Sequence, residues 1–163
     1  MIVVNDTAAL SSLAIAGQLS LLKQLYNTVI IPQAVADELA KASSDDSGIG
    51  AIPTLSWIEI RQASNSSMVN TLQEQQDLDT GDAEAIILAL ELGAERILMD
   101  ERLSRQAAIK IGLPITGILG ILVAAKIEGL ISAVKPVMDD LISQAGFWVS
   151  GQLYDEVLQA VGE

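Results

Sequence analysis

The fold is decided by the opening stretch of the chain, Met1-Ile-Val-Val-Asn-Asp-Thr-Ala-Ala-Leu10. Its three β-favouring apolar residues, Ile2 to Val4, are typical of a short strand that is buried on both faces. A helical pattern follows from Ala8. Asp6 therefore stands where a strand ends and a helix begins, which is where ligands bind in an open α/β sheet. On this stretch alone, a helix cap by Asp6 or Thr7 is the simpler interpretation.

Short apolar runs continue to alternate with helical patterns along the chain. Further strands are predicted over residues 29–31, 57–61, 97–99 and 114–116. Helices are predicted over residues 8–16, 19–26, 33–42, 69–76, 82–92, 101–111, 117–127, 134–144 and 150–161. This alternation indicates a parallel sheet covered by helices on both faces. We therefore expect an α/β fold, a three-layer α/β/α sandwich whose five-stranded parallel sheet has the order 3-2-1-4-5.

The length of 163 residues is typical of one domain with its own core. We expect a single domain over residues 1–163, with a C-terminal helical extension over about 133–163. Residues 43–53 are rich in Ser, Asp and Gly and are predicted to form an inserted loop. The mean hydropathy of +0.42 leaves two interpretations open. One is a well-filled core, and the other is a homodimer that buries apolar helix faces.

The composition limits the chemistry that the chain can perform. It has no cysteine and no histidine, which excludes disulfides, thiol chemistry, Ser-His-Asp triads and zinc sites built on these residues. The lack of cysteine fits a reducing compartment, so a cytoplasmic location is expected. Any metal chemistry has to rest on carboxylates, which prefer hard cations such as Mg²⁺ or Mn²⁺.

The charge and hydropathy patterns exclude other functions. A net charge of −12 argues against a protein that coats nucleic acid by bulk attraction. Lys and Arg nevertheless gather locally, and four of the nine lie between residues 96 and 110. No signal peptide is expected, because the start lacks a basic segment. The most apolar run, residues 111–125, is broken by Pro114 and is too short to cross a bilayer, so no membrane partner is expected.

Carboxylates recur at the positions where a sheet of this order would place a site. Asp100 follows the predicted strand 97–99, just as Asp6 follows the first strand. Strands 1 and 4 are neighbours in the expected order, so these two side chains should lie side by side. The predicted helix 33–42 places Glu38 on its apolar inner face, and Glu84 lies on the helix 82–92, so both helices would rim the same crevice. A solvent-facing edge is the plainer interpretation of Glu84, but apolar residues on the same helix face argue against it. Converging carboxylates repel one another, and a divalent cation relieves that repulsion.

Four short motifs follow one another along the chain: VVNDT at 3–7, ADEL at 36–39, GDAEAIILALELGA at 81–94 and ILMDE at 97–101. In their order and spacing they resemble the PIN domain, the fold of VapC-type toxin ribonucleases. Within that family, the chain resembles a bacterial and archaeal branch that has a GEAEAI-like helix. That branch also has a C-terminal extension similar to residues 142–163, ISQAGFWVSGQLYDEVLQAVGE.

The resemblance implies a function and a set of site residues. The acidic residues that it marks as catalytic and metal-binding are Asp6, Glu38, Glu84 and Asp100, with Asp82 as a second candidate. It implies that RNA is cleaved by water activated on Mg²⁺ or Mn²⁺, and that a small antitoxin protein is a partner. Proximity in the chain further assigns the positioning of the phosphate to Thr7, Arg102, Arg105 and Thr116.

Two other functions remain open at this stage. A phosphatase of the haloacid-dehalogenase type also carries an aspartate after strand 1, but it has a D-x-D motif there. Here the residue two positions after Asp6 is Ala8, which argues against that class. A non-catalytic interaction module, in which the acids only cap helices, would explain the acidity. The complete acidic set argues against it, because a decayed site would have lost a member.

Overall fold

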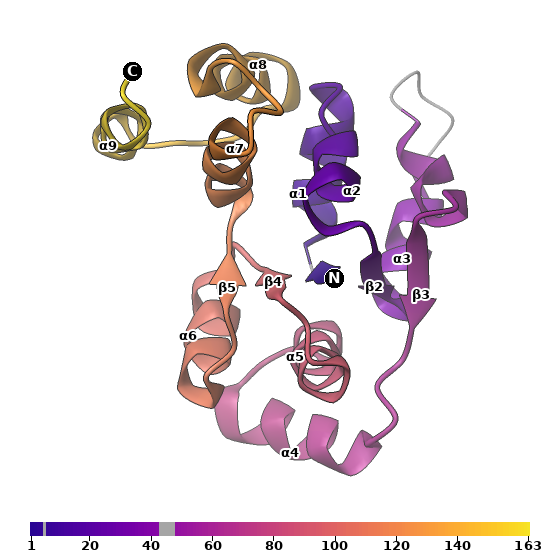
Figure 1. Ribbon diagram of the computed structural model, residues 1–163. Helices are drawn as coiled ribbons and strands as arrows, with labels where there is room; N and C mark the ends of the chain where they lie inside the picture. Colours follow the sequence, from indigo (N-terminus) through magenta and orange to yellow (C-terminus); the bar gives the residue numbers. More distant parts are fainter. Residues whose placement is uncertain (5, 43–47) are drawn as a thin grey trace.

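A computed structural model describes residues 1–4, 6–42 and 48–163. Within these ranges, five parallel strands form one sheet in the order β3-β2-β1-β4-β5 (Figure 1). The strands are β1 Ile2–Val4, β2 Val29–Pro32, β3 Ile58–Arg61, β4 Arg96–Leu98 and β5 Ile115–Thr116. The predicted α/β class, the parallel sheet and the strand order are therefore confirmed.

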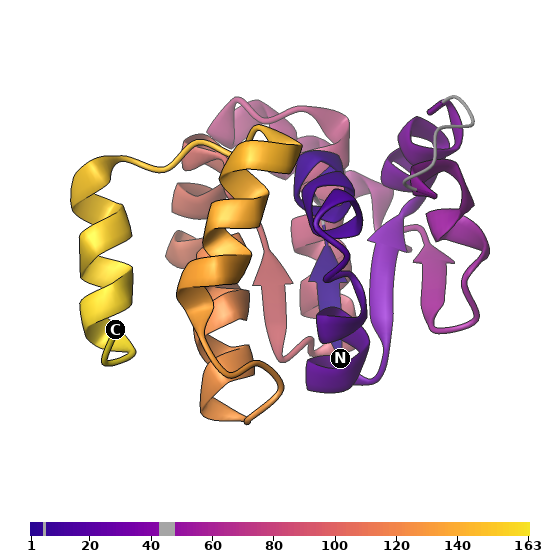
Figure 2. The same cartoon turned by 90° about the horizontal axis from the view of Figure 1, so that it is seen from above.

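The helices cover both faces of this sheet (Figures 1 and 2). They are α1 Thr7–Ile15, α2 Ser20–Tyr26, α3 Gln33–Ala40, α4 Ser66–Gln76, α5 Thr80–Leu92, α6 Arg102–Ile111, α7 Ile118–Ile127, α8 Val134–Ala145 and α9 Gly151–Ala160. Each of their ends lies within three residues of the predicted one. Within the described part of the chain, no helix combines the length and the apolar character needed to cross a membrane.

The inserted loop predicted over residues 43–53 can be compared with the structure only from residue 48 onward. Residues 43–47 lie outside the described residues. Ile49–Thr54 form a 3₁₀ helix, η1, so the prediction of a loop was wrong for this part. The physical reason is burial, because Ile49 and Ile52 pack into the core. A composition rich in Ser, Asp and Gly concealed these two apolar anchors.

The sheet separates two apolar cores. The side chains of β1 alternate between them, since Ile2 and Val4 face one core and Val3 faces the other. Helices α1, α3, α7 and α8 contribute to the first core, and α4, α5 and α6 contribute to the second. All three β1 residues are completely buried. A strand buried on both faces explains why the opening run is apolar without alternation.

Helix α5 crosses the middle of the second core. Its sequence is apolar almost all round, and seven of its residues are buried, from Asp82 to Ala89. Asp79 caps its first turn by accepting a hydrogen bond of 2.8 Å from the backbone N–H of Asp82. The helix ends at Gly93, which has a positive φ of 60° and closes the last turn. This placement fixes the first turn of α5 beside the carboxyl ends of the strands.

The C-terminal helix α9 lies at the edge of the molecule, beyond α7 in Figures 1 and 2. The carboxylate of Glu163 accepts hydrogen bonds from the backbone N–H of Val134 at 2.7 Å and from Nζ of Lys126 at 2.9 Å. These bonds, led by the Val134 N–H, lower the pKa of Glu163 to about 2. The Tyr154 hydroxyl also donates to Asp139 at 2.6 Å. Polar bonds therefore join α9 to α7 and α8.

Candidate functional site

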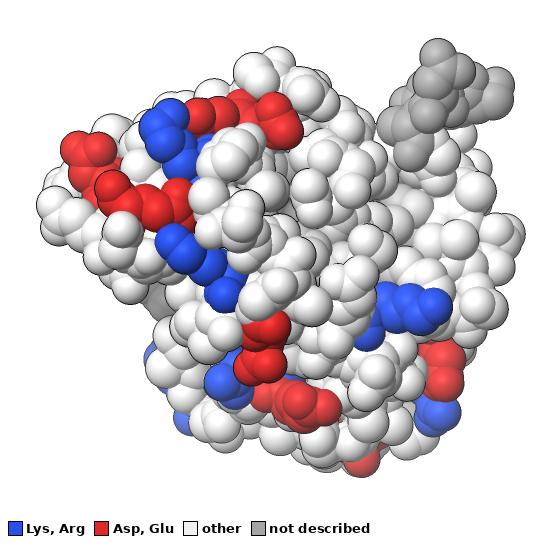
Figure 3. Space-filling model, turned by 45° about the horizontal axis from the view of Figure 1, so that its top comes forward, with Lys and Arg blue, Asp and Glu red and all other residues white. Residues whose placement is uncertain are grey.

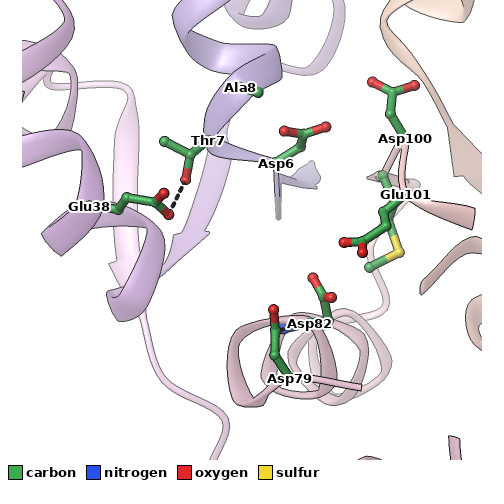
Figure 4. A pocket seen from close by; sticks show the side chains of 9 residues that line it. Asp6, Thr7, Ala8, Glu38, Asp79, Asp82, Asp100 and Glu101 are labelled. Carbon is green, nitrogen blue, oxygen red and sulfur yellow. Dashed lines mark hydrogen bonds between the residues drawn. The ribbon is translucent and has the colours of Figure 1, made fainter. Parts of the chain in front are cut away.

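An acidic cavity of about 450 Å³ opens at the carboxyl ends of β1 and β4 (Figure 4). These two strands are paired, with Val4 opposite Leu98 in the register. The residues that line the cavity are Asp6, Thr7, Ala8, Glu38, Asp79, Asp82, Met99, Asp100 and Glu101. Six of the nine are acidic, so the cavity concentrates negative charge. We call it the acidic pocket.

Asp6 reaches the acidic pocket from the end of β1. Its Oδ1 accepts a hydrogen bond of 3.1 Å from the backbone N–H of Ala9, so Asp6 also caps α1. The cap interpretation drawn from the opening stretch is thus confirmed. A carboxylate has two oxygens and about four acceptor sites, and this bond engages one of them. Capping fixes the orientation of Asp6 and leaves it able to bind a ligand.

Asp100 reaches the acidic pocket from the end of β4. Desolvation by the surrounding protein raises its pKa, and the negative charge of Asp6 raises it further. The backbone N–H of Ile118 and the guanidinium of Arg105 lower the pKa and offset part of this effect. Gly117 explains how Asp100 can approach the start of α7, because a Cβ at position 117 would collide with Oδ1 of Asp100.

Glu38 reaches the rim of the acidic pocket from α3. Its Oε2 accepts a hydrogen bond of 2.8 Å from the Thr7 hydroxyl, drawn as a dashed line in Figure 4. The buried face of α3 is formed by Val35, Ala36 and Leu39, whereas Glu38 is exposed. The expectation that Glu38 lies on the inner face was wrong, because it stands one step past the edge of that face. It still joins the same cavity as Asp6.

Helix α5 contributes Asp79 and Asp82 to the acidic pocket. Both side chains lie on one side of the cavity in Figure 4, with Glu101 between them and Asp100. Asp82 is only 8% exposed, and the structure gives it interactions with its surroundings. Its negative charge is the first of several causes that raise the pKa of Glu101; burial, Asp79 and Asp6 follow. The negative charges of three other acids of the pocket therefore act on Glu101.

Glu84 does not line the acidic pocket. Its Oε1 accepts a hydrogen bond of 3.3 Å from the backbone N–H of Ala63. Glu91, two turns further along α5, accepts from the N–H groups of Ser64 and Asn65 at 3.1 and 3.0 Å. Both glutamates hold the segment that connects β3 to α4. Two residues along a helix turn a side chain by about 200°, so α5 directs Asp82 to the cavity and Glu84 elsewhere.

The predicted phosphate-positioning residues do not gather in one place. Thr7 lines the acidic pocket, whereas Arg105 and Thr116 line a neighbouring groove that shares Asp100 with it. Nη1 of Arg105 donates to the carbonyl of Met99 at 2.7 Å. Arg102 is exposed in the first turn of α6 and lines neither cavity. Of the two arginines predicted from their nearness in the sequence, only Arg105 lies next to the site.

A family model described as a PIN domain matches residues 2–163 of the chain. The chain belongs to the PIN domain family. Proteins with a PIN domain are generally nucleases, and these nucleases generally use divalent metal ions. This family favours a nuclease over the haloacid-dehalogenase alternative. A comparison with curated proteins finds no match to this PIN domain.

The acidic pocket of this PIN domain fits a hard divalent cation by its chemistry. All of its charged lining residues offer carboxylate oxygens, the ligand type that Mg²⁺ and Mn²⁺ prefer. The pKa of Asp100 is raised first by desolvation and then by the charge of Asp6, and the pKa of Glu101 is raised first by the charge of Asp82. A bound cation would stabilise the charged form of both groups. Among the described residues, no three acidic side chains stand close enough together to hold a metal ion. The side chains would have to draw together around a bound ion.

Two acids of this PIN domain, Asp79 and Glu101, were not among the predicted site residues. Asp79 carries the usual mark of a helix cap, since it precedes Thr80 and an apolar helical run. Glu101 follows Asp100 directly and opens α6 without capping it by its side chain. A sequence pattern that points to caps does not reveal whether a carboxylate also faces a cavity.

Proposed function

We propose that this PIN domain is a metal-dependent endoribonuclease that cleaves RNA phosphodiester bonds at the acidic pocket and acts in the cytoplasm. The observation that carries the proposal is the arrival of three aspartates at one cavity from three different elements. Asp6 follows β1, Asp82 belongs to the first turn of α5, and Asp100 follows β4. Because Asp82 is buried and Asp100 is desolvated by the surrounding protein, water screens the repulsion among the three carboxylates only weakly, and a bound cation would relieve it.

The chemistry divides between a bound ion and the side chains. Asp6, Asp82 and Asp100 would hold Mg²⁺ or Mn²⁺, which would supply an activated water and offset the charge on the phosphate. The Ala9 N–H fixes the carboxylate of Asp6, and Thr7 fixes that of Glu38. Glu101, whose pKa is raised, is suited to orienting the attacking water or to carrying a proton.

Two substitutions on α5 test this proposal and the choice of Asp82 over Glu84. The parent should cleave a mixed RNA pool with Mn²⁺ and stop cleaving in excess chelator. Asp82→Asn should lower the cleavage rate by at least about 10-fold, as loss of support for a metal site does. Glu84→Gln should keep cleavage close to the parent, because Glu84 bonds to the backbone of Ala63.

The same assay exposes the alternatives. Cleavage that persists in chelator, or that survives Asp82→Asn, would contradict the proposed site. A loss of activity in Glu84→Gln without a loss of stability would return the site to the set implied by the family resemblance. A parent without any cleavage would favour a non-catalytic interaction module. That alternative is supported by the lack of a ready three-acid cluster among the described residues.

We further propose partners for this PIN domain. The acidic pocket would accept a Lys or Arg side chain from a small antitoxin, in keeping with a VapC-like toxin. A reading frame for a small protein next to this one would support that role, and an isolated gene would count against it. A second copy of the chain is the other proposed partner. Its support is a groove of about 400 Å³ between α4, α5 and α6, lined by Met68, Leu90 and Ile111.

A further inference from the structure

A second groove adjoins the acidic pocket and shares Asp100 with it. It has a volume of about 540 Å³ and lies between the start of α7, helix α6 and the segment that leads from α8 into α9. Arg105 and Thr116 line it on the sheet side, and Phe147, Trp148 and Leu153 line it on the α9 side. We call it the aromatic groove. A molecule bound there would extend directly into the acidic pocket.

Trp148 is the unusual residue of the aromatic groove. Only 3% of the chain is aromatic, and it contains two tryptophans. Trp57 packs against the first core, whereas the side chain of Trp148 is 81% exposed. An indole presents a wide flat apolar face, and leaving it in water gains nothing for folding. The groove therefore offers a surface on which a planar apolar group can stack.

Hydrogen bonds hold the backbone on both sides of Trp148. The N–H of the preceding residue, Phe147, donates to the carbonyl of Leu141 at 3.0 Å. On the other side, the Ser150 hydroxyl caps α9 by accepting from the N–H of Leu153 at 3.1 Å. The bonds of Glu163 hold α9 against the start of α8. A ligand would therefore meet a groove whose backbone is already ordered, which reduces the entropy lost on binding.

Arg105 places a positive charge in the aromatic groove, beside Asp100. Its guanidinium has five N–H donors, of which the bond to Met99 uses one. A guanidinium binds a phosphate through paired hydrogen bonds. The two adjoining cavities thus present a flat apolar face, a cation and a cluster of carboxylates. These three features suit one nucleotide: a base on the apolar face, its phosphate at the cation, and the next phosphate at the acidic pocket.

We propose that Trp148 is a stacking platform for one base of a single-stranded RNA substrate, next to the bond that is cleaved. This inference rests on the proposed ribonuclease function and names the form of its substrate. Bases inside a duplex are stacked on each other and cannot reach an indole face, whereas unpaired bases can. Continuity with Asp100 and the charge of Arg105 favour a nucleotide over a second copy of the chain.

The test measures binding apart from cleavage. The affinity of the parent for a fluorescently labelled single-stranded oligoadenylate is titrated in chelator, where cleavage is stopped. Trp148→Ala should weaken binding by roughly 5- to 150-fold, the range for one stacked base. Trp148→Phe should restore most of the affinity, because it keeps an aromatic face. Trp148→Leu should not restore it, because it is apolar but lacks that face.

Three controls separate the base from other causes. Ile127→Ala removes an apolar side chain on α7 that is 75% exposed and lies outside the groove, so binding should stay unchanged. An oligonucleotide of the same length without bases should bind the parent and Trp148→Ala equally. Light scattering should give both proteins the same mass. A change of mass in Trp148→Ala would mean that a second copy covers the groove, which would overturn the proposal.

The remaining outcomes distinguish this inference from the proposed function. If Trp148→Ala binds and cleaves like the parent while Asp82→Asn does not cleave, the stacking platform is wrong and the ribonuclease stands. If the parent does not cleave but its binding still depends on an aromatic residue at 148, the platform stands and the ribonuclease is wrong. Equal affinity of Trp148→Leu and Trp148→Phe would also overturn the platform.

Discussion

Asp100 shows how burial and then repulsion disfavour the charged form of an acid in the acidic pocket. Its pKa is raised chiefly by desolvation and then by Asp6. The folded protein therefore holds a proton more tightly than the unfolded chain in the pH range just above the ordinary pKa of aspartate. Because stability falls with rising pH wherever the folded state binds more protons, Asp100 lowers the free energy of unfolding as the pH rises through its raised pKa.

Thermal melts of Asp100→Asn test this repulsion. The metal-free variant should melt no lower than the parent, because Asn is neutral and can still accept a hydrogen bond from Ile118. The loss of stability of the parent with rising pH should become smaller in the variant. Mn²⁺ at about a hundredfold above its Kd should stabilise the parent by about 2.7 kcal/mol and the variant by less. A variant that melts well below the parent in the absence of metal would show that Asp100 stabilises the fold.

Single side chains of the site could be predicted from the sequence only in part. Asp6 and Asp100 were placed together correctly, because each follows a buried strand and the expected strand order made these strands neighbours. Asp82 and Glu84 are only two positions apart, and the family resemblance assigned the leading role to Glu84. The structure sends their side chains to different places. The rotation of α5 about its own axis decides which of the two side chains faces the cavity. That rotation depends on how the whole helix packs against the core.

Helices α4, α5 and α6 form a face whose apolar residues are not fully covered. Met68, Leu90 and Ile111 line one groove there, and their exposed fractions are 47%, 39% and 38%. Isolated exposed apolar residues are ordinary, but a contiguous group marks an interaction surface. The proposed homodimer would bury this group.

A charge placed in this face should separate the two chains. Light scattering at micromolar concentration should give the parent the mass of two chains, and Met68→Asp the mass of one. The melting temperature of the Met68→Asp monomer should remain measurable, since Met68 is exposed. Ile127→Asp adds the same charge at an exposed site on α7 and should remain a dimer. A parent that is already a monomer, or a Met68→Asp dimer, would contradict the proposed interface.

At the scale of elements, alternating patterns predicted strands and helices well. The short runs at β1, β2 and β4 are buried on both faces, so their apolar character could be recognised without knowledge of their neighbours. The element η1 could not be recognised in this way. Its two buried isoleucines are separated by small residues and lie in a polar stretch. Their burial depends on α3 and β3, which contact η1 in space.

The whole molecule carries a charge that opposes binding of RNA. The net charge is −12, and on the face shown in Figure 3 Lys and Arg lie beside Asp and Glu and form no continuous basic surface. Long-range attraction therefore cannot supply affinity for a polyanion. Binding has to come from local contacts, namely the guanidinium of Arg105 and the face of Trp148, to which a cation at the acidic pocket would add. Cleavage of the bound RNA depends on that metal ion.

The most direct test of that dependence is to locate the ion. Crystals of the protein soaked in Mn²⁺ should show an anomalous difference peak in the acidic pocket, with oxygens of Asp6, Asp82 and Asp100 about 2 Å from it. Crystals of Asp82→Asn should show a weaker peak or none under the same soak. Full occupancy in the parent with Glu84 distant from the ion would support the account. A pocket without a peak at saturating Mn²⁺, or an ion bound through Glu84 instead of Asp82, would contradict it.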